Sequence, residues 1–264
     1  MKKLILSSLA MASLAFAANA VTNMCVEQSD GTIVRYDVDK VKQVYYATAD
    51  QSVTVSGKEG IYTYVDLGLE SGTKWATCNV GATKPTEYGD YFAWGETNPK
   101  EDYSWETYKL RENKKMDDEW GFPHDFTKYC TDSYFGTVDK KKVLYAEDDA
   151  ATANWGSPWR MPTKDEIEEL LDGCFWEWVE DFSGSGVNGR LGTSKKNGAT
   201  IFLPATGYRE NTDLSKEDYY GYYWSSSLDE GDPDNAFYFH FFDAYIYRGN
   251  YSRYSGLSVR AVLR

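Results

Sequence analysis

The sequence predicts an α+β domain in which antiparallel sheet dominates, and three observations lead to this prediction. Short runs of alternating apolar and polar residues recur along most of the chain, as expected for strands with one buried face. Two tight-turn signals, Asp30-Gly31 and Asn197-Gly198, separate such runs. One amphipathic helix is expected after Pro162, because Thr163 and Glu166 have the spacing of a capping box.

Residues 1–20 have the features of a signal peptide. Two lysines precede an apolar run, and Ala18-Asn19-Ala20 has the small-residue pattern of a cleavage site. The run is shorter than the roughly 20 residues of a membrane helix, so no membrane span is expected. We therefore expect a secreted or cell-surface protein. The formal net charge of -13 argues against a nucleic-acid partner, because phosphate binding requires clustered Lys and Arg.

Residues 21–60 predict a small β-hairpin unit followed by a linker. Met24–Gln28 and Thr32–Tyr36 flank the first tight turn, and Val41–Tyr46 is expected to add a third strand. Residues 47–60 are small, polar and weakly patterned, which indicates either a linker or a connection at a sheet edge.

A second domain is expected over residues 61–264. The long charged stretch 96–153 has no regular period, and we expect its aromatic residues to pin it to the domain. The capped helix is expected to end at Gly173. Arg190–Lys195 and Ala199–Leu203 are predicted to form the second hairpin. The tryptophans in apolar runs are predicted to be core residues: Trp75, Trp94, Trp159 and Trp224.

The stretch 219–264 is the most aromatic part of the chain. Phe237, Phe239 and Phe241 alternate with Tyr238, His240 and Phe242, which predicts a strand with one inward face and one available face. Arg160 and Arg260 lie at the ends of apolar runs, where we expect them to pair with buried carboxylates such as Asp148 or Asp149.

Eight fragments occur in order along residues 61–264: residues 65–69, 75–82, 89–96, 148–151 with 154–156, 159–163, 202–205, 223–226 and 258–260. Together they resemble the Fibrobacter succinogenes major paralogous domain (FISUMP) family of exported bacterial proteins. That family is similar to the C-type-lectin-like fold, which also hosts formylglycine-generating enzymes. The resemblance implies a C-type-lectin-like domain of twisted antiparallel sheets with one or two helices, preceded here by the hairpin unit. It implies no particular activity.

No catalytic, cofactor or metal site is predicted. A formylglycine-generating activity would require a late cysteine pair, whereas the last cysteine is Cys174. Ser225–Ser227 lack the Gly-x-Ser-x-Gly pattern of a nucleophile elbow. The oxygen-rich loop Asp229–Asn235 lacks EF-hand spacing and is interpreted as an exposed acidic turn. Within the recognised domain, Cys78 and Cys174 are predicted to form a disulfide, because core residues border both.

The sequence favours a non-enzymatic binding or adhesion module that recognises an extracellular protein or glycan. A mixture of Tyr, Ser, Asn, Gly and Arg near the end of the chain is typical of adaptable binding loops. Two alternatives stay open: a structural subunit of a bacterial surface assembly, attached through the hairpin unit, and a calcium-assisted lectin or hydrolase. The predicted ligand-binding residues are Tyr245, Tyr247, Asn250, Tyr251, Arg253 and Tyr254.

Overall fold

The computed structural model describes residues 23–27, 32–38, 51–112 and 124–264. The chain divides into two compact units, Met1–Asp50 and Gln51–Arg264, which are described separately. In the first unit, β1 (Asn23–Glu27) pairs antiparallel with β2 (Ile33–Asp37), as the Asp-Gly signal predicts. The predicted signal peptide and the predicted third strand lie outside the described residues.

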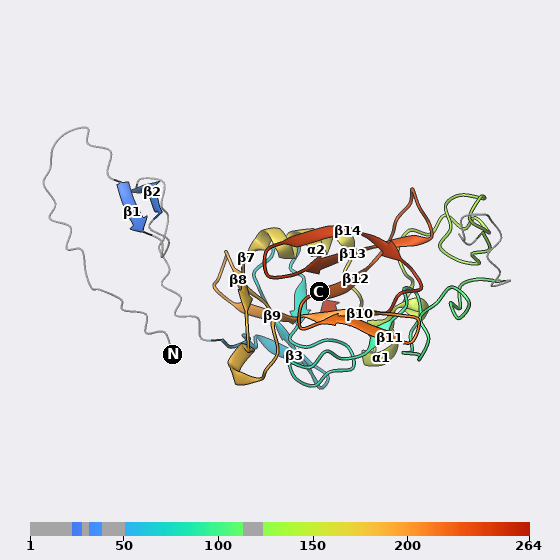
Figure 1. Cartoon of the computed structure of the whole chain (residues 1–264), viewed down its shortest axis with the longest axis horizontal. Coiled ribbons are helices and arrows are strands. Elements are labelled where there is room, and N and C mark those ends of the chain that lie inside the picture. Colours follow the sequence, from blue (N-terminus) through green and yellow to red (C-terminus); the bar gives the residue numbers. More distant parts are fainter. Residues whose placement is uncertain (1–22, 28–31, 39–50, 113–123) are drawn as a thin grey trace, which may run out of the picture. The chain divides into compact units, whose positions relative to one another are not determined.

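The second unit is built around a sheet with the order β11-β10-β12-β13-β14, and Figure 1 shows these strands following one another. β10 and β12 run parallel, whereas β12, β13 and β14 form an antiparallel meander. Strand β15 pairs parallel with β12 and antiparallel with β6, so it lies between them. The strands are β6 (Tyr91–Phe92), β10 (Thr206–Glu210), β11 (Asp213–Glu217), β12 (Gly221–Leu228), β13 (Asn235–Phe241), β14 (Ile246–Ser252) and β15 (Leu257–Ser258).

Two smaller antiparallel sheets complete this unit. The first has the order β16-β5-β4-β3, and the second has the order β7-β8-β9. The strands of the first are β3 (Gly57–Glu59), β4 (Tyr62–Val65), β5 (Lys74–Ala76) and β16 (Val262–Leu263). Those of the second are β7 (Cys174–Val179), β8 (Gly189–Ser194) and β9 (Thr200–Pro204). Strand β3 thus lies inside the segment expected to be a linker or an edge connection, and it forms an edge of its sheet.

Helices are few, so the described chain has the α+β character that the sequence predicts. Helix α1 is Ala150–Trp155, and short 3-10 helices occupy Ala146–Asp148 and Phe182–Gly184. Helix α2 (Lys164–Gly173) begins at the predicted capping box and ends at the predicted glycine. No helix of the described residues is long and apolar enough to cross a membrane.

Two large hydrophobic clusters form the core. The larger one contains Trp94, Trp159 and Trp224, and the second contains Trp75 together with Tyr223 and side chains from α2. All four tryptophans are buried, which confirms their predicted role. The charged stretch is pinned as expected, because five of its aromatic residues are buried in the larger cluster: Tyr103, Trp105, Tyr108, Phe126 and Tyr129.

The predicted disulfide between Cys78 and Cys174 is not present. All four cysteines lie in the described residues, and each is a free thiol. The Cys78 thiol donates a hydrogen bond to the carbonyl of Ala82 at 3.4 Å, whereas Cys174 packs in the second hydrophobic cluster. Each buried sulfur therefore has its own surroundings, and both belong to the apolar interior as free cysteines commonly do.

Candidate binding surface

The β12–β13–β14 meander packs one face against the second hydrophobic cluster, whereas its other face is partly exposed and partly covered, with Trp224 and Tyr238 buried in the larger cluster. Directly opposite residues in an antiparallel sheet share a face. Tyr223 and Phe239 are paired, and both are buried in the cluster that also holds α2. Tyr222, His240 and Tyr247 are paired across the three strands on the other face, and all three are at least partly exposed. The face predicted to be available is therefore the one that carries Tyr238, His240 and Phe242.

Nine aromatic side chains form a continuous set of ring contacts on this partly exposed face, where Tyr238 is buried and Tyr245 and Tyr247 are the most exposed. The rings of Tyr222, Tyr238 and His240 are nearly parallel, with centroids 5.3 to 5.9 Å apart. Tyr208 of β10 adds a further ring, whose centroid lies 4.9 Å from that of Tyr222. We call this set the aromatic face; it consists of Tyr208, Tyr220, Tyr222, Tyr238, His240, Phe242, Tyr245, Tyr247 and Tyr251.

The aromatic face carries polar atoms but no formal charge near neutral pH. The hydroxyl of Tyr238 and Nδ1 of His240 lie 2.8 Å apart, in hydrogen-bond contact. Burial lowers the pKa of His240, so its imidazole is neutral at pH 7. Burial raises the pKa of Tyr222 to about 12, which keeps its phenol protonated. At the margin, the Tyr251 hydroxyl donates to Glu210 at 3.1 Å. The face therefore offers hydroxyl groups and apolar rings together.

Three of the predicted binding residues lie on the aromatic face. Tyr245 and Tyr247 are 69% and 58% exposed, and Tyr251 is partly buried between its neighbours. Asn250 is exposed, but it pairs with Phe237 and so lies on the opposite side of the sheet. There its amide donates to the carboxylate of Asp229. The structure thus separates Asn250 from the tyrosines that sequence reasoning grouped with it.

Arg253 was predicted to contact a ligand, and the structure contradicts this prediction. Its side chain is completely buried, and its guanidinium lies 4.4 Å from the centroid of the Phe126 ring. It donates hydrogen bonds to the Tyr108 hydroxyl and to three backbone carbonyls. Tyr254 is partly buried against Trp105, 4.7 Å between centroids. Arg253 holds the charged stretch in place, because a buried cation needs this many acceptors.

Sequence reasoning missed the contribution of Tyr208, Tyr220 and Tyr222 to the aromatic face. Tyr208 belongs to β10, which lies beside β12 through a parallel pairing of Gly207 with Gly221. No local pattern reveals such a pairing. The alternation of β13 was a usable signal for its own part of the face, because it separates the residues that face the core from those that do not.

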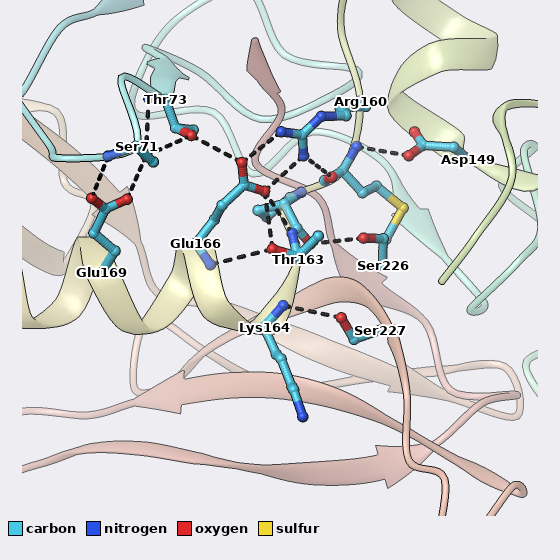
Figure 2. A network of polar contacts seen from close by, with 12 residues as sticks. Ser71, Thr73, Asp149, Arg160, Thr163, Lys164, Glu166, Glu169, Ser226 and Ser227 are labelled. Carbon is cyan, nitrogen blue, oxygen red and sulfur yellow. Dashed lines mark hydrogen bonds and ion pairs between the residues drawn. The ribbon is translucent and has the colours of Figure 1, made fainter. Parts of the chain in front are cut away.

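A polar network surrounds the start of α2, which it also ties to β12, because the Lys164 amide donates to the Ser227 hydroxyl at 3.1 Å. The Glu166 carboxylate accepts hydrogen bonds from both terminal nitrogens of Arg160, at 2.7 and 2.5 Å, and from the Thr163 amide (Figure 2). Burial alone would raise the pKa of Glu166, but these hydrogen bonds hold it at about 2. The carboxylate partner of Arg160 is therefore Glu166, whereas Asp149 accepts from the backbone amide of Met161.

The acidic loop is less exposed than predicted. Asp234 is 3% exposed, and burial together with the neighbouring Asp232 raises its pKa. The Asn235 amide donates to both carboxylates. Among the described residues, no group of three or more His, Cys, Asp or Glu side chains is placed to hold a metal ion. A pocket on the α2 side of the meander is lined by Lys164, Glu168, Phe237 and Arg248, among others.

Comparisons with known proteins identify one similarity. Residues 162–262 match a family described as a domain of unknown function (DUF8237). The matched span contains α2 and all nine residues of the aromatic face. No curated protein and no solved structure matches the chain.

Proposed function

We propose that this chain is an exported, non-enzymatic binding or adhesion module whose contact surface is the aromatic face. The observation that carries the proposal is the continuous set of nine aromatic rings on the partly exposed face of the meander, which ends in the exposed rings of Tyr245 and Tyr247. Aromatic side chains supply large contact areas at low entropy cost and dominate binding energy at interfaces. Most of these rings are already in contact with two or more neighbours, so little conformational freedom would be lost on binding.

An extracellular glycan fits this surface better than a protein does. The rings pack well against the apolar C–H groups of a sugar, and Tyr hydroxyls can exchange hydrogen bonds with sugar hydroxyls. The nine side chains bear no charge at neutral pH, since His240 is neutral, and this matches a neutral ligand. A protein partner is the other outcome of the test below.

The experiment is a binding screen of residues 21–264 against panels of neutral and acidic glycans and of extracellular proteins. The variant Tyr245→Ala/Tyr247→Ala removes the two most exposed rings of the face. The matched control, Tyr134→Ala/Phe175→Ala, removes two similarly exposed rings elsewhere. We expect the first variant to weaken binding at least tenfold, and the control to have no effect. Equal binding by both variants would place the site elsewhere, and a chemically altered ligand would show an enzyme.

We also propose that residues 61–264 have the C-type-lectin-like architecture that the FISUMP resemblance implies. Two features support this proposal: the β12–β13–β14 meander lies late in the chain, and the final strand β16 returns to pair with β5 near the start of the domain. An experimental structure, superposed on members of both groups, would test it; a different strand order in the superposition would reject it.

A further inference from the structure

We propose that the free edge of β14 pairs with β14 of a second copy of this chain, in an antiparallel two-fold dimer centred on Gly249. β14 is the last strand of its sheet, and it pairs with β13 without a bulge over all seven of its residues. Figure 1 shows it at the rim of the sheet. An uninterrupted edge of this length is a template for strand pairing.

The alternation of hydrogen bonds between β13 and β14 shows which backbone groups of β14 point away from β13. At one end of the meander the Phe242 amide donates to the carbonyl of Tyr245, and at the other the Arg253 amide donates to Asp234. Antiparallel pairs alternate between bonded and non-bonded. Residues 247, 249 and 251 therefore point their backbone groups toward β13, whereas residues 246, 248, 250 and 252 point theirs outward. In the described chain, only the Ser252 carbonyl of this outward set has another partner, the amide of Ser255.

A two-fold axis at Gly249 brings these outward groups into register. Arg248 then lies opposite Asn250 of the second copy. Within the described ranges the backbone amides and carbonyls of both residues have no partner, so each of the two equivalent pairs can form two hydrogen bonds. Gly249 lies opposite itself as a non-bonded pair, where backbones come closest. A Cβ at Gly249 would lie 2.8 Å from the Tyr247 ring, so the Tyr247 ring disfavours any side chain at this position.

Side chains on both faces suit the same register. On the aromatic face, Tyr247 lies opposite Tyr251 of the second copy, which is a favourable cross-strand aromatic pair. On the other face, Arg248 lies opposite Asn250 of the second copy, and Asn250 holds the Asp229 carboxylate. Arg248 is 3.7 and 3.8 Å from its nearest carboxylates within the chain, so it has capacity for a closer one. No like charges lie directly opposite each other.

The partner is a second copy because pairing of the strand with itself about Gly249 places Tyr247 opposite Tyr251 and the cation Arg248 opposite the neutral Asn250, with Ile246 opposite Ser252 at the ends. Two-fold closure limits the assembly to a dimer. The aromatic faces of both copies would then form one continuous surface. This inference does not depend on whether that surface binds a ligand.

The test compares Asn250→Pro with Asn250→Ala in residues 21–264 by sedimentation equilibrium. Both variants lose the side-chain contact with Asp229, but only proline removes the outward amide, and proline is tolerated at such edge positions. We expect the wild type and the alanine variant to form dimers, and proline to raise the dimer dissociation constant tenfold or more. Hydrogen exchange at the amides of Arg248 and Asn250 should slow as protein concentration rises.

Three results would overturn the proposal: a wild type that stays monomeric at all concentrations, equal dimerisation by both variants, or exchange at these amides that is independent of concentration. If the proline variant fails to fold, Arg248→Glu provides a second test at an exposed side chain. It should weaken the dimer by facing Asp229 of the second copy, and adding Asp229→Lys in the same chain should restore it. Failure of that restoration would also reject the register.

Discussion

Replacing Arg253 with methionine should destabilise the domain severely. The side chain donates to the Tyr108 hydroxyl at 2.9 Å and to the carbonyls of Lys128, Tyr129 and Pro233 at 2.9 to 3.1 Å. Methionine fills similar volume but donates nothing, so three buried acceptors and the partly buried Lys128 carbonyl lose their partner. An unsatisfied buried group costs about 1 to 3 kcal/mol, and partial hydration relieves some of this. We therefore expect a loss of about 3 to 5 kcal/mol in the free energy of unfolding.

The measurement is urea denaturation of the Arg253→Met variant, with thermal melting as a second readout. For a domain of this size the loss corresponds to a drop of roughly 6 to 20 °C in Tm. Arg248→Met is the matched control, because Arg248 lies on β14 with an exposed side chain, and it should change stability by less than about 0.5 kcal/mol. A folded Arg253→Met protein as stable as this control would refute the assigned role of the buried guanidinium.

Three further predictions concern titration and thiols. Burial lowers the pKa of His240, so the neutral imidazole contributes stability that is present above its unfolded pKa of about 6.5 and is lost as pH falls through the lower folded pKa. The variant His240→Phe should therefore reduce the change of unfolding free energy with pH in this range. The Glu166 carboxylate contributes stability that is present above about pH 4.5 and is lost as pH falls toward 2, about 1 to 2 kcal/mol after allowance for solvent screening, and Glu166→Gln should remove this dependence. Cys25 is exposed and should be alkylated rapidly in the native protein, whereas burial raises the pKa of the other thiols, so mass spectrometry should find them modified only after unfolding: Cys78, Cys130 and Cys174.

Local chemistry predicted the local elements well. The capping box placed the start of α2 at Thr163, and Asn197-Gly198 placed the turn between β8 and β9, because each signal lies within a few residues of the structure that it specifies. The alternation in β13 likewise distinguished its core side from its open side.

The composition of the binding surface could not be predicted in the same way. Arg253 lies among tyrosines in the sequence, yet rings from residues 94, 108 and 126 enclose it. The charged stretch that supplies two of these rings has no regular period. Tyr208 reaches the aromatic face only through the parallel pairing of β10 with β12. Contacts between distant segments decided both cases, and they leave no local pattern.

The pairing of β16 with β5 has a consequence for the order of events during synthesis. Trp75 lies opposite Val262, and Phe92 of β6 lies opposite Leu257 of β15, so early strands receive their neighbours from the end of the domain. Until those late residues have been made and can pair, β5 and β6 lack these neighbours, and their edges and large apolar side chains stay uncovered. Such long-range pairing slows folding, and it makes an unfinished chain a better substrate for quality control than a finished one.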